Sequence, residues 1–188
     1  MPPAFPDQRS IERSLAGREH PAPGTAQSEA AVLACLNHEA LLLVRRRRDP
    51  RDRWSGHIGL PGGRREEGDA TLLDTALRET EEELGFDPLT RGRLAGPLGA
   101  ELAHHRRPDD LAIAVFVALL DVRPALALSA EIDSAYWVPL AELTVETARV
   151  PEVPEPVPAY RPLVHGERLV VWGITYRILE QLRSLRPA

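Results

Sequence analysis

Four apolar runs predict strands in this chain. Residues 31–36 and 40–44 are almost wholly apolar and are separated by three polar residues, which is the pattern of a β-hairpin. Residues 111–120 are nearly all apolar and predict a buried strand, and residues 135–140 predict a shorter one. A helical turn is expected directly after the last of these strands.

The strongest helix signal covers residues 70–84. Asp69 or Thr71 can cap its start, and Gly85 can end it. At about 100° per residue, one side of this helix gathers Leu73, Ala76, Leu77, Thr80 and Leu84. A second amphipathic helix, from about 167 to 185, is expected to close the chain. Strands and helices are therefore mixed, and the fold class is α/β or α+β.

Glycine and proline mark the segments that we expect to be irregular. These are the Gly-Leu-Pro-Gly-Gly run at 59–63 and residues 144–166, which hold five prolines and predict a long loop inside the domain. Residues 1–28 predict an N-terminal arm with a short helix around 10–18, capped by the serine at its start. Residues 29–188 are expected to form one domain.

Composition excludes several classes of protein. The chain has 188 residues, the length of one domain, and contains no run of apolar residues long enough to span a membrane. Charged residues throughout the first thirty positions argue against a secretory signal. The one cysteine, Cys35, lies in an apolar run and is expected to be an inert core residue. We therefore expect a cytoplasmic protein, and a homodimer is possible.

Charge is distributed unevenly along the chain. The net charge of −5 argues against a dedicated nucleic-acid binder, although all 23 basic residues are arginines. Eight of these arginines fall between positions 45 and 65, against two aspartates, and the segment that follows, up to position 83, is acidic. A basic cluster followed by an acidic one suits a site that holds a small anionic substrate beside a cation.

The acidic segment includes four glutamates within the run Arg78-Glu-Thr-Glu-Glu-Glu83. Most such runs are solvated helix faces, and like charges four residues apart repel each other. Here, however, the run follows a Gly-Gly loop and an arginine cluster. Glu79 and Glu83, four residues apart on one helix, suit a hard divalent cation such as Mg²⁺, which takes oxygen ligands from one or two carboxylates and from substrate phosphates.

Residues 63–86, GRREEGDATLLDTALRETEEELGF, resemble the signature of the Nudix hydrolases. That signature reads G, five residues, E, seven residues, then REUxEExGU, where U is a bulky apolar residue. The second half matches, with Thr80 at the first U position. The first half departs from it, because Asp69 stands where the family usually has glutamate and eight residues, not seven, separate Asp69 from Arg78.

These departures, an aspartate followed by one extra residue, resemble the signature of the coenzyme A pyrophosphatase branch of the family. The upstream residues 41–45 (LLLVR) and 56–63 (GHIGLPGG) also resemble that branch, as do residues 171–175 near the end of the chain. One arginine expected at a fixed distance before Gly56 is out of register, because Asp52 stands at that position, between Arg51 and Arg53.

The resemblance implies a Nudix-type α/β/α sandwich with a mixed β-sheet, and a site that uses Mg²⁺ or Mn²⁺. The implied metal ligands are the Gly63 carbonyl and the carboxylates of Glu79, Glu82 and Glu83. Arg78 is expected to hold helix and loop together by bridging carboxylates. The general base stays open between Glu82 and Glu101, which we expect in the loop before the long strand.

For substrate, the resemblance implies coenzyme A or its derivatives, cleaved to adenosine 3′,5′-bisphosphate and 4′-phosphopantetheine or its acyl form. Arg45, Arg53 and His57 are the candidate substrate-binding residues, since arginine offers a two-pronged fork to phosphate oxygens. One alternative is the same chemistry on ADP-ribose, NADH, a dinucleoside polyphosphate or a dNTP. A non-catalytic nucleotide-binding module is another, and an RNA-directed role has only the arginine run in its favour.

Overall fold

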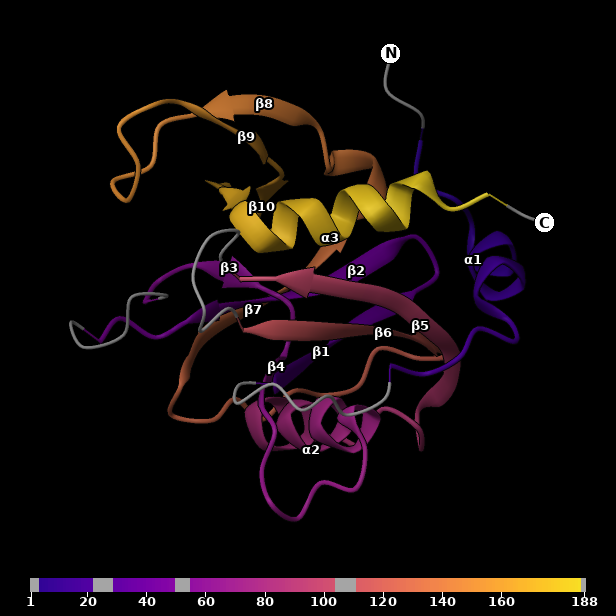
Figure 1. Ribbon diagram of the computed structural model, residues 1–188. Helices are drawn as coiled ribbons and strands as arrows, with labels where there is room; N and C mark the ends of the chain where they lie inside the picture. The colour runs from indigo at the N-terminus through magenta and orange to yellow at the C-terminus, as the bar shows by residue number, and fades with distance from the viewer. Residues whose placement is uncertain (1–3, 22–28, 50–54, 104–110, 187–188) are drawn as a thin grey trace.

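The computed structural model describes residues 4–21, 29–49, 55–103 and 111–186. Its centre is a β-sheet with helices on both faces (Figure 1). Helix α2 (Leu72–Leu84) covers one face, while α1 (Gln8–Leu15) and α3 (Gly173–Ser184) pack on the other. This arrangement confirms the α/β/α sandwich. None of the described helices is both long and apolar enough to cross a membrane.

The central sheet has the strand order β3-β2-β1-β6-β5, with β4 also paired to β1 and β7 also paired to β2. Its strands are β1 (Glu29–Asn37), β2 (Ala40–Arg46), β3 (Ile58–Gly59), β4 (Gly62–Arg64), β5 (Gly92–Leu102), β6 (Ala112–Leu120) and β7 (Ile132–Pro139). Strands β1 and β6 run parallel, and every other pair is antiparallel. The sheet is therefore mixed, and the predicted hairpin of β1 and β2 is confirmed.

Two apolar cores lie on opposite faces of this sheet. Because side chains alternate along a strand, Val115 and Val117 of β6 belong to the core under α3, while Phe116 and Ala118 belong to the core under α2. Both faces of β6 are covered, which explains why its sequence is an unbroken apolar run. Cys35 is fully buried, and burial raises the pKa of its thiol to about 12, as suits an inert core residue.

The prediction of one long loop at 144–166 was wrong. Strand β8 (Val145–Ala148) pairs with β9 (Val157–Tyr160), and β9 pairs in turn with β12 (Val171–Trp172). A second small sheet joins β10 (Leu163–Val164) to β11 (Glu167–Arg168). Prolines mislead here because Pro158 lies in the part of β9 that pairs with β8 alone, and a strand edge without a partner needs no N–H donor.

Two other boundaries differ from the prediction. The closing helix starts at Gly173 and not near 167, because β11 and β12 occupy the residues before it. The 59–63 run is not wholly irregular, since it contains parts of β3 and β4. Gly62 pairs with Val32 at φ +143°, and a Cβ there would lie 2.3 Å from the Ala31 carbonyl oxygen, so only glycine permits this pairing. The predicted helical turn is a 3₁₀ turn, η1 (Leu140–Glu142).

Strand β5 carries no strand signal in the sequence, because three glycines and a proline interrupt it. It pairs with β6 along its whole length, with irregularities at Leu94/Gly96 and Pro97/Gly99. Glu101 therefore lies in a strand, and the prediction of a loop was wrong. Helix α1 starts at Gln8 with Asp7 as its cap, and its Ile11 and Leu15 are buried in the core on the α3 side of the sheet.

Candidate active site

Helix α2 carries most of the candidate residues, and both its ends are fixed locally. The Thr71 side chain accepts a hydrogen bond from the Asp74 backbone N–H, and the Asp74 carboxylate accepts one from the Thr71 N–H. This reciprocal pair is a capping box. Gly85 ends the helix at φ +74°, a conformation that favours glycine. Of the two predicted caps, the structure uses Thr71.

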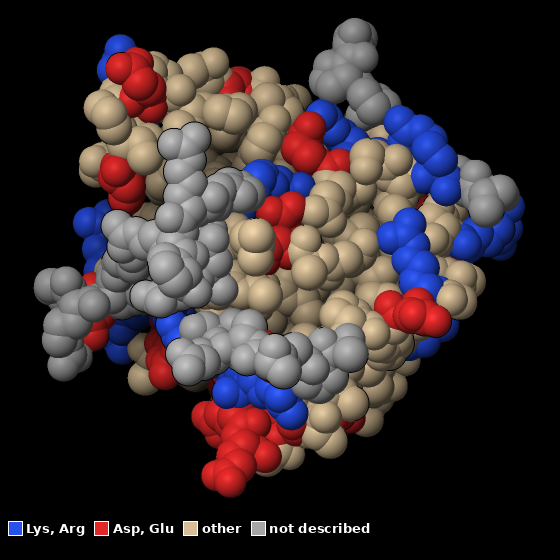
Figure 2. Space-filling model, viewed as in Figure 1, with Lys and Arg blue, Asp and Glu red and all other residues tan. Residues whose placement is uncertain are grey.

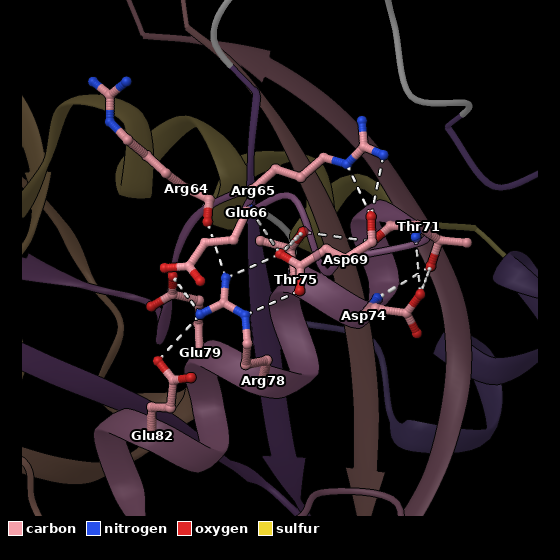
Figure 3. Close-up of polar contacts among 10 residues, drawn as sticks. All are labelled: Arg64, Arg65, Glu66, Asp69, Thr71, Asp74, Thr75, Arg78, Glu79 and Glu82. Carbon is pink, nitrogen blue, oxygen red and sulfur yellow. Dashed lines mark hydrogen bonds and ion pairs between the residues drawn. The ribbon is translucent and has the colours of Figure 1, made fainter.

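Asp69 instead binds Arg78, at the centre of the network drawn in Figure 3. Arg78 Nε and a terminal nitrogen each donate to a carboxylate oxygen of Asp69 at 3.0 Å. The Thr75 hydroxyl and the Glu66 N–H donate to the same carboxylate, both at 2.9 Å. These contacts, led by the Arg78 guanidinium, hold the pKa of Asp69 well below its usual value. The aspartate is thus a fixed, ionised anchor.

Arg78 also reaches beyond Asp69. It donates to the Arg64 carbonyl at 3.1 Å, to Glu79 at 3.2 Å and to Glu82 at 3.1 Å. One guanidinium thereby joins the loop before α2 to two carboxylates of the helix (Figure 3). This is the bridging role expected from the sequence.

The Glu79 carboxylate lies so close to Gly63 that any larger residue there would have to push it aside. A Cβ built on Gly63 would lie 2.4 Å from the Glu79 carboxyl carbon. The carboxylate therefore lies against the Gly63 backbone. Burial raises the pKa of Glu79, and the neighbouring arginine only partly opposes that change.

Glu83 is the most enclosed of the signature glutamates, with 6% of its side chain exposed. Its carboxylate accepts a hydrogen bond from the Gly62 N–H at 3.0 Å and lies 3.9 Å from the Arg46 guanidinium. Burial raises its pKa to about 7, and the charge of Glu79 acts in the same direction. Glu83 and Glu79 thus form a pair of poorly compensated carboxylates beside the glycine loop.

Glu82 differs from these two. Its side chain is 60% exposed. Figure 2 shows acidic side chains gathered at the lower edge of the molecule, where α2 and the loop before it lie in Figure 1. Among the described residues, Arg78 donates to its Oε2 at 3.1 Å. Glu82 is therefore open to water, whereas Glu83 accepts a backbone hydrogen bond from Gly62 and Glu79 is enclosed against Gly63.

The donor set fits a hard divalent cation. Within the described residues no group of three or more carboxylate, histidine or cysteine side chains is arranged so that it could hold a metal ion. Glu79 and Glu83, however, are partly desolvated carboxylates with raised pKa values, and a cation would supply the charge that they lack. With the Gly63 carbonyl they offer only oxygen ligands, the type that Mg²⁺ and Mn²⁺ take.

Glu101 does not lie with these residues. It projects from β5 toward α3, where Arg177 Nε donates to it at 2.8 Å and Gln181 also donates. Helix α3 covers the sheet face opposite α2. The second candidate base is thus separated by the sheet from Glu79, Glu82 and Glu83.

A cavity of about 460 Å³ opens beside the carboxylates. Its lining residues are Arg45, Arg46, Arg47, Arg48, Gly56, Ile58, Asp133, Glu167, Arg168, Leu169 and Val170. Five arginines against two acidic residues make it strongly cationic. Arg46 belongs both to this lining and to the surroundings of Glu83, so the cavity and the carboxylate site adjoin.

The three predicted substrate-binding residues have different positions. Arg45 lines the cavity, while Arg53 lies outside the described residues. His57 Nε2 is 2.8 Å from a Glu152 oxygen, and its ring lies against Trp172. His57 therefore joins the start of β3 to the β8–β9 connection and to β12.

Sequence reasoning missed the acidic side of the cavity. Asp133 and Glu167 lie far from the arginine cluster in the chain, and neither belongs to a motif. Arg168 was missed for the same reason. Only the pairing of β7 with β2 and the β10–β11 hairpin bring these residues to Arg45.

Comparison with known proteins gives the family. Residues 26–160 match the model of the NUDIX domain. An uncharacterized protein of Schizosaccharomyces pombe, C14C4.10c, is 38% identical over 107 residues, which are 55% of this chain and 32% of that protein. The chain thus spans about a third of that relative's length. The uncharacterized Nudix hydrolase NudL of Yersinia pestis is 29% identical over 161 residues, 81% of this chain and 77% of NudL.

Solved structures share the fold at low identity. The NUDIX domain of Shewanella oneidensis NrtR, complexed with ADP ribose, has a TM-score of 0.57 at 22% identity and covers 85% of this chain and 88% of its own. A MutT NUDIX hydrolase of Burkholderia pseudomallei has a TM-score of 0.54 at 20% identity, covering 82% and 96%. A C. elegans Ap4A hydrolase has a TM-score of 0.51 at 19% identity, covering 61% and 81%.

Proposed function

Because the chain belongs to the Nudix family and is a hydrolase of phosphorus-containing anhydrides, we propose that it cleaves the pyrophosphate of coenzyme A or its acyl derivatives. The products would be adenosine 3′,5′-bisphosphate and 4′-phosphopantetheine or its acyl form. Nudix hydrolases generally use divalent metal ions. In this proposal Mg²⁺ or Mn²⁺ is held by Glu79, Glu82, Glu83 and the Gly63 carbonyl.

The residues divide the chemical work. When bound, the cation neutralises the pyrophosphate and lowers the pKa of bound water. Glu79 and Glu83 hold their carboxylates against the glycine loop, and Arg78 orients Glu79 and Glu82 from Asp69. Glu82, exposed beside both, is our candidate to take the proton of the attacking water. Glu101, the second candidate, is bound by Arg177 and Gln181 on the opposite face of the sheet and has no part in this proposal.

The observation that carries the substrate proposal is the arginine cavity beside Glu83. Coenzyme A has a phosphate monoester on its ribose in addition to the pyrophosphate, and it needs cationic contacts at a second place. Five arginines, Arg45 to Arg48 and Arg168, line that cavity, and Arg46 also lies 3.9 Å from Glu83 of the carboxylate site. Arginine binds phosphate oxygens through two parallel hydrogen bonds.

The alternative substrates fit the carboxylate site equally well. ADP-ribose, NADH, dinucleoside polyphosphates and dNTPs all offer a pyrophosphate to the same cation. ADP ribose in the NrtR complex and the Ap4A hydrolase are examples of what similar folds bind or cleave. Coenzyme A carries a ribose phosphate that ADP-ribose and NADH lack, and the arginines of the cavity support coenzyme A because they could bind it.

The test is a parallel assay with mass spectrometry of the products. The purified protein is incubated with Mg²⁺ or Mn²⁺ and coenzyme A, 3′-dephospho-coenzyme A, ADP-ribose, NADH, Ap4A or a dNTP. We expect adenosine 3′,5′-bisphosphate from coenzyme A at the highest kcat/KM, and no product in excess chelator. Faster turnover of ADP-ribose or NADH would favour one of these alternative substrates over coenzyme A. No turnover of any compound with either metal would contradict the proposal that the protein is a pyrophosphohydrolase.

Arg45→Ala sharpens the test. It should lower kcat/KM for coenzyme A roughly tenfold, within the range for a charged hydrogen bond, and should change that for ADP-ribose little. Arg91→Ala, an exposed arginine outside the cavity, is the matched control.

A further inference from the structure

A carboxylate already occupies the guanidinium that the substrate phosphate would need. Glu167 Oε1 is ion-paired with a terminal nitrogen of Arg45. The Tyr136 hydroxyl donates to Glu167 Oε2 at 3.1 Å, and the Arg45 guanidinium lies 5.3 Å from the centre of the Tyr136 ring. Asp133 is a more distant second carboxylate, 4.0 Å from Arg45. Tyr136 thus contacts both members of the Arg45–Glu167 ion pair.

This pair is held loosely enough to be exchanged. The Glu167 side chain is 48% exposed and that of Arg45 is 23% exposed. Ion pairs that solvent reaches are weak, because water and salt screen them. The hydrogen bond from Arg45 lowers the pKa of Glu167, so this carboxylate is ionised at neutral pH.

The hairpin of β10 and β11 presents Glu167 to the cavity. His165 and Gly166, both at positive φ, form the turn directly before Glu167. Leu163 pairs with Arg168 and Val164 with Glu167, so the two cavity residues follow the turn in a short strand. Glu167 lies beyond residues 26–160, which match the NUDIX family model. The carboxylate therefore comes from a part of the chain outside the shared domain.

We propose that Glu167 is a built-in competitor for the phosphate monoester of the substrate and so limits how strongly the cavity prefers substrates that carry it; this proposal rests on the proposed function. A phosphate monoester near neutral pH carries more negative charge than a carboxylate and offers three oxygens. It can displace Glu167 from Arg45. A substrate that has only a hydroxyl at this place leaves the pair intact and gains nothing from Arg45.

The first test compares coenzyme A with 3′-dephospho-coenzyme A in Glu167→Gln. Removing the competing charge should lower KM for coenzyme A roughly two- to fivefold, in line with the small strength of an exposed ion pair, while kcat stays similar. KM for the dephospho compound should not fall. If Glu167 merely held Arg45 in place, KM for coenzyme A would rise, so an increase or no change overturns the proposal.

A second test needs no turnover. Inorganic phosphate serves as the probe, and its dissociation constant is measured by calorimetry or from the concentration dependence of the melting temperature. Glu167→Gln should bind phosphate more tightly than the wild type, again by roughly two- to fivefold. Glu142→Gln, an exposed glutamate outside the cavity, should bind phosphate like the wild type.

The double variant assigns the effect to Arg45. In an Arg45→Ala background, Glu167→Gln should change neither phosphate affinity nor KM for coenzyme A. Equal effects with and without Arg45 would overturn the proposal. If coenzyme A is not cleaved but Glu167→Gln still tightens phosphate binding through Arg45, the competition stands and the proposed substrate falls. If coenzyme A is cleaved and phosphate binding is unchanged, the competition falls and the proposed function stands.

Discussion

The carboxylate site and the arginine cavity adjoin at Arg46 but are built in different ways. Around α2, positions are fixed by the backbone: Gly62 donates to Glu83, and Gly63 lies directly against Glu79. Around the cavity, positions depend on pairs of long side chains such as Arg45 and Glu167, both partly exposed to water. Backbone contacts and burial leave few alternative conformations, whereas exposed ion pairs exchange readily.

This difference matches the two tasks of the proposed function, which are cleavage of the pyrophosphate and selection of the substrate. Cleaving a pyrophosphate needs carboxylates at defined places, since small displacements of a catalytic group cost much of the rate. Selecting among substrates needs a surface that responds to one additional phosphate. We therefore expect changes around α2 to affect turnover or folding, and changes in the cavity to affect mainly KM. Substitutions of Glu83, Asp69, Gly63 and Gly62 test this expectation for the residues around α2.

The largest effect is expected from Glu83→Gln. Loss of this ligand charge should weaken metal binding and lower turnover at least about a hundredfold, since the cation contributes several kcal/mol to the transition state. Because burial raises the pKa of Glu83 to about 7, its ionised form costs stability at pH 8, so the variant should melt no lower than the wild type there. Kinetics and calorimetry measure both effects. Glu81→Gln, an exposed neighbour on the same helix, is the control, and full activity of Glu83→Gln would contradict its assignment as a ligand.

Asp69→Asn should affect folding more than chemistry. It removes the anionic partner of Arg78, and breaking a largely buried pair costs about 3 kcal/mol. The pKa of Asp69 lies below its ordinary 3.8, so the stabilisation is present above that pH and fades as the pH falls below it. The difference from the wild type should therefore be large at pH 7 and smaller at pH 3 in urea unfolding. Glu67→Gln, exposed in the same loop, is the control, and a difference independent of pH would rule out the ionic explanation.

Substitutions of the two adjacent glycines should have different effects, at Gly63 mainly on turnover and at Gly62 mainly on stability. In Gly63→Ala the new Cβ meets the flexible end of Glu79, which can move, so stability should change by less than about 1 kcal/mol while turnover falls roughly tenfold. In Gly62→Ala the Cβ meets the Ala31 carbonyl at 2.3 Å and φ is +143°, so unfolding should become easier by about 2 kcal/mol. Melting curves and rates of both variants test this. Unchanged turnover in Gly63→Ala would mean that Glu79 need not lie against the loop.

Local signals predicted the carboxylate site well. The caps of α2, its end at Gly85 and the bridging role of Arg78 all depend on residues within about two dozen positions of one another. At that range, helix periodicity and glycine conformation decide geometry almost alone. The apolar runs of β1, β2 and β6 were equally clear, because a strand covered on both faces must be apolar throughout.

The sequence did not predict the features that depend on partners far away in the chain. The glycines and proline of β5 hide a strand that exists because β6 offers it a full-length partner. Pro158 was interpreted as a loop residue, yet β9 is stabilised by β8 and β12. Glu101 was grouped with the α2 glutamates by type, whereas the side of the strand from which it projects places it at Arg177.

The sequence by itself determined the helix with its glutamates, because short-range spacing and glycine conformation fix it, while the sandwich followed from the resemblance to the Nudix family. Only the tertiary structure decided which charges share the arginine cavity. Asp133 reaches Arg45 through the pairing of β7 with β2, and Glu167 and Arg168, on the β10–β11 hairpin, line the same cavity although they lie far from Arg45 in the chain. Such long-range contacts are selected by the packing of the whole sheet and leave no local pattern from which they could be predicted.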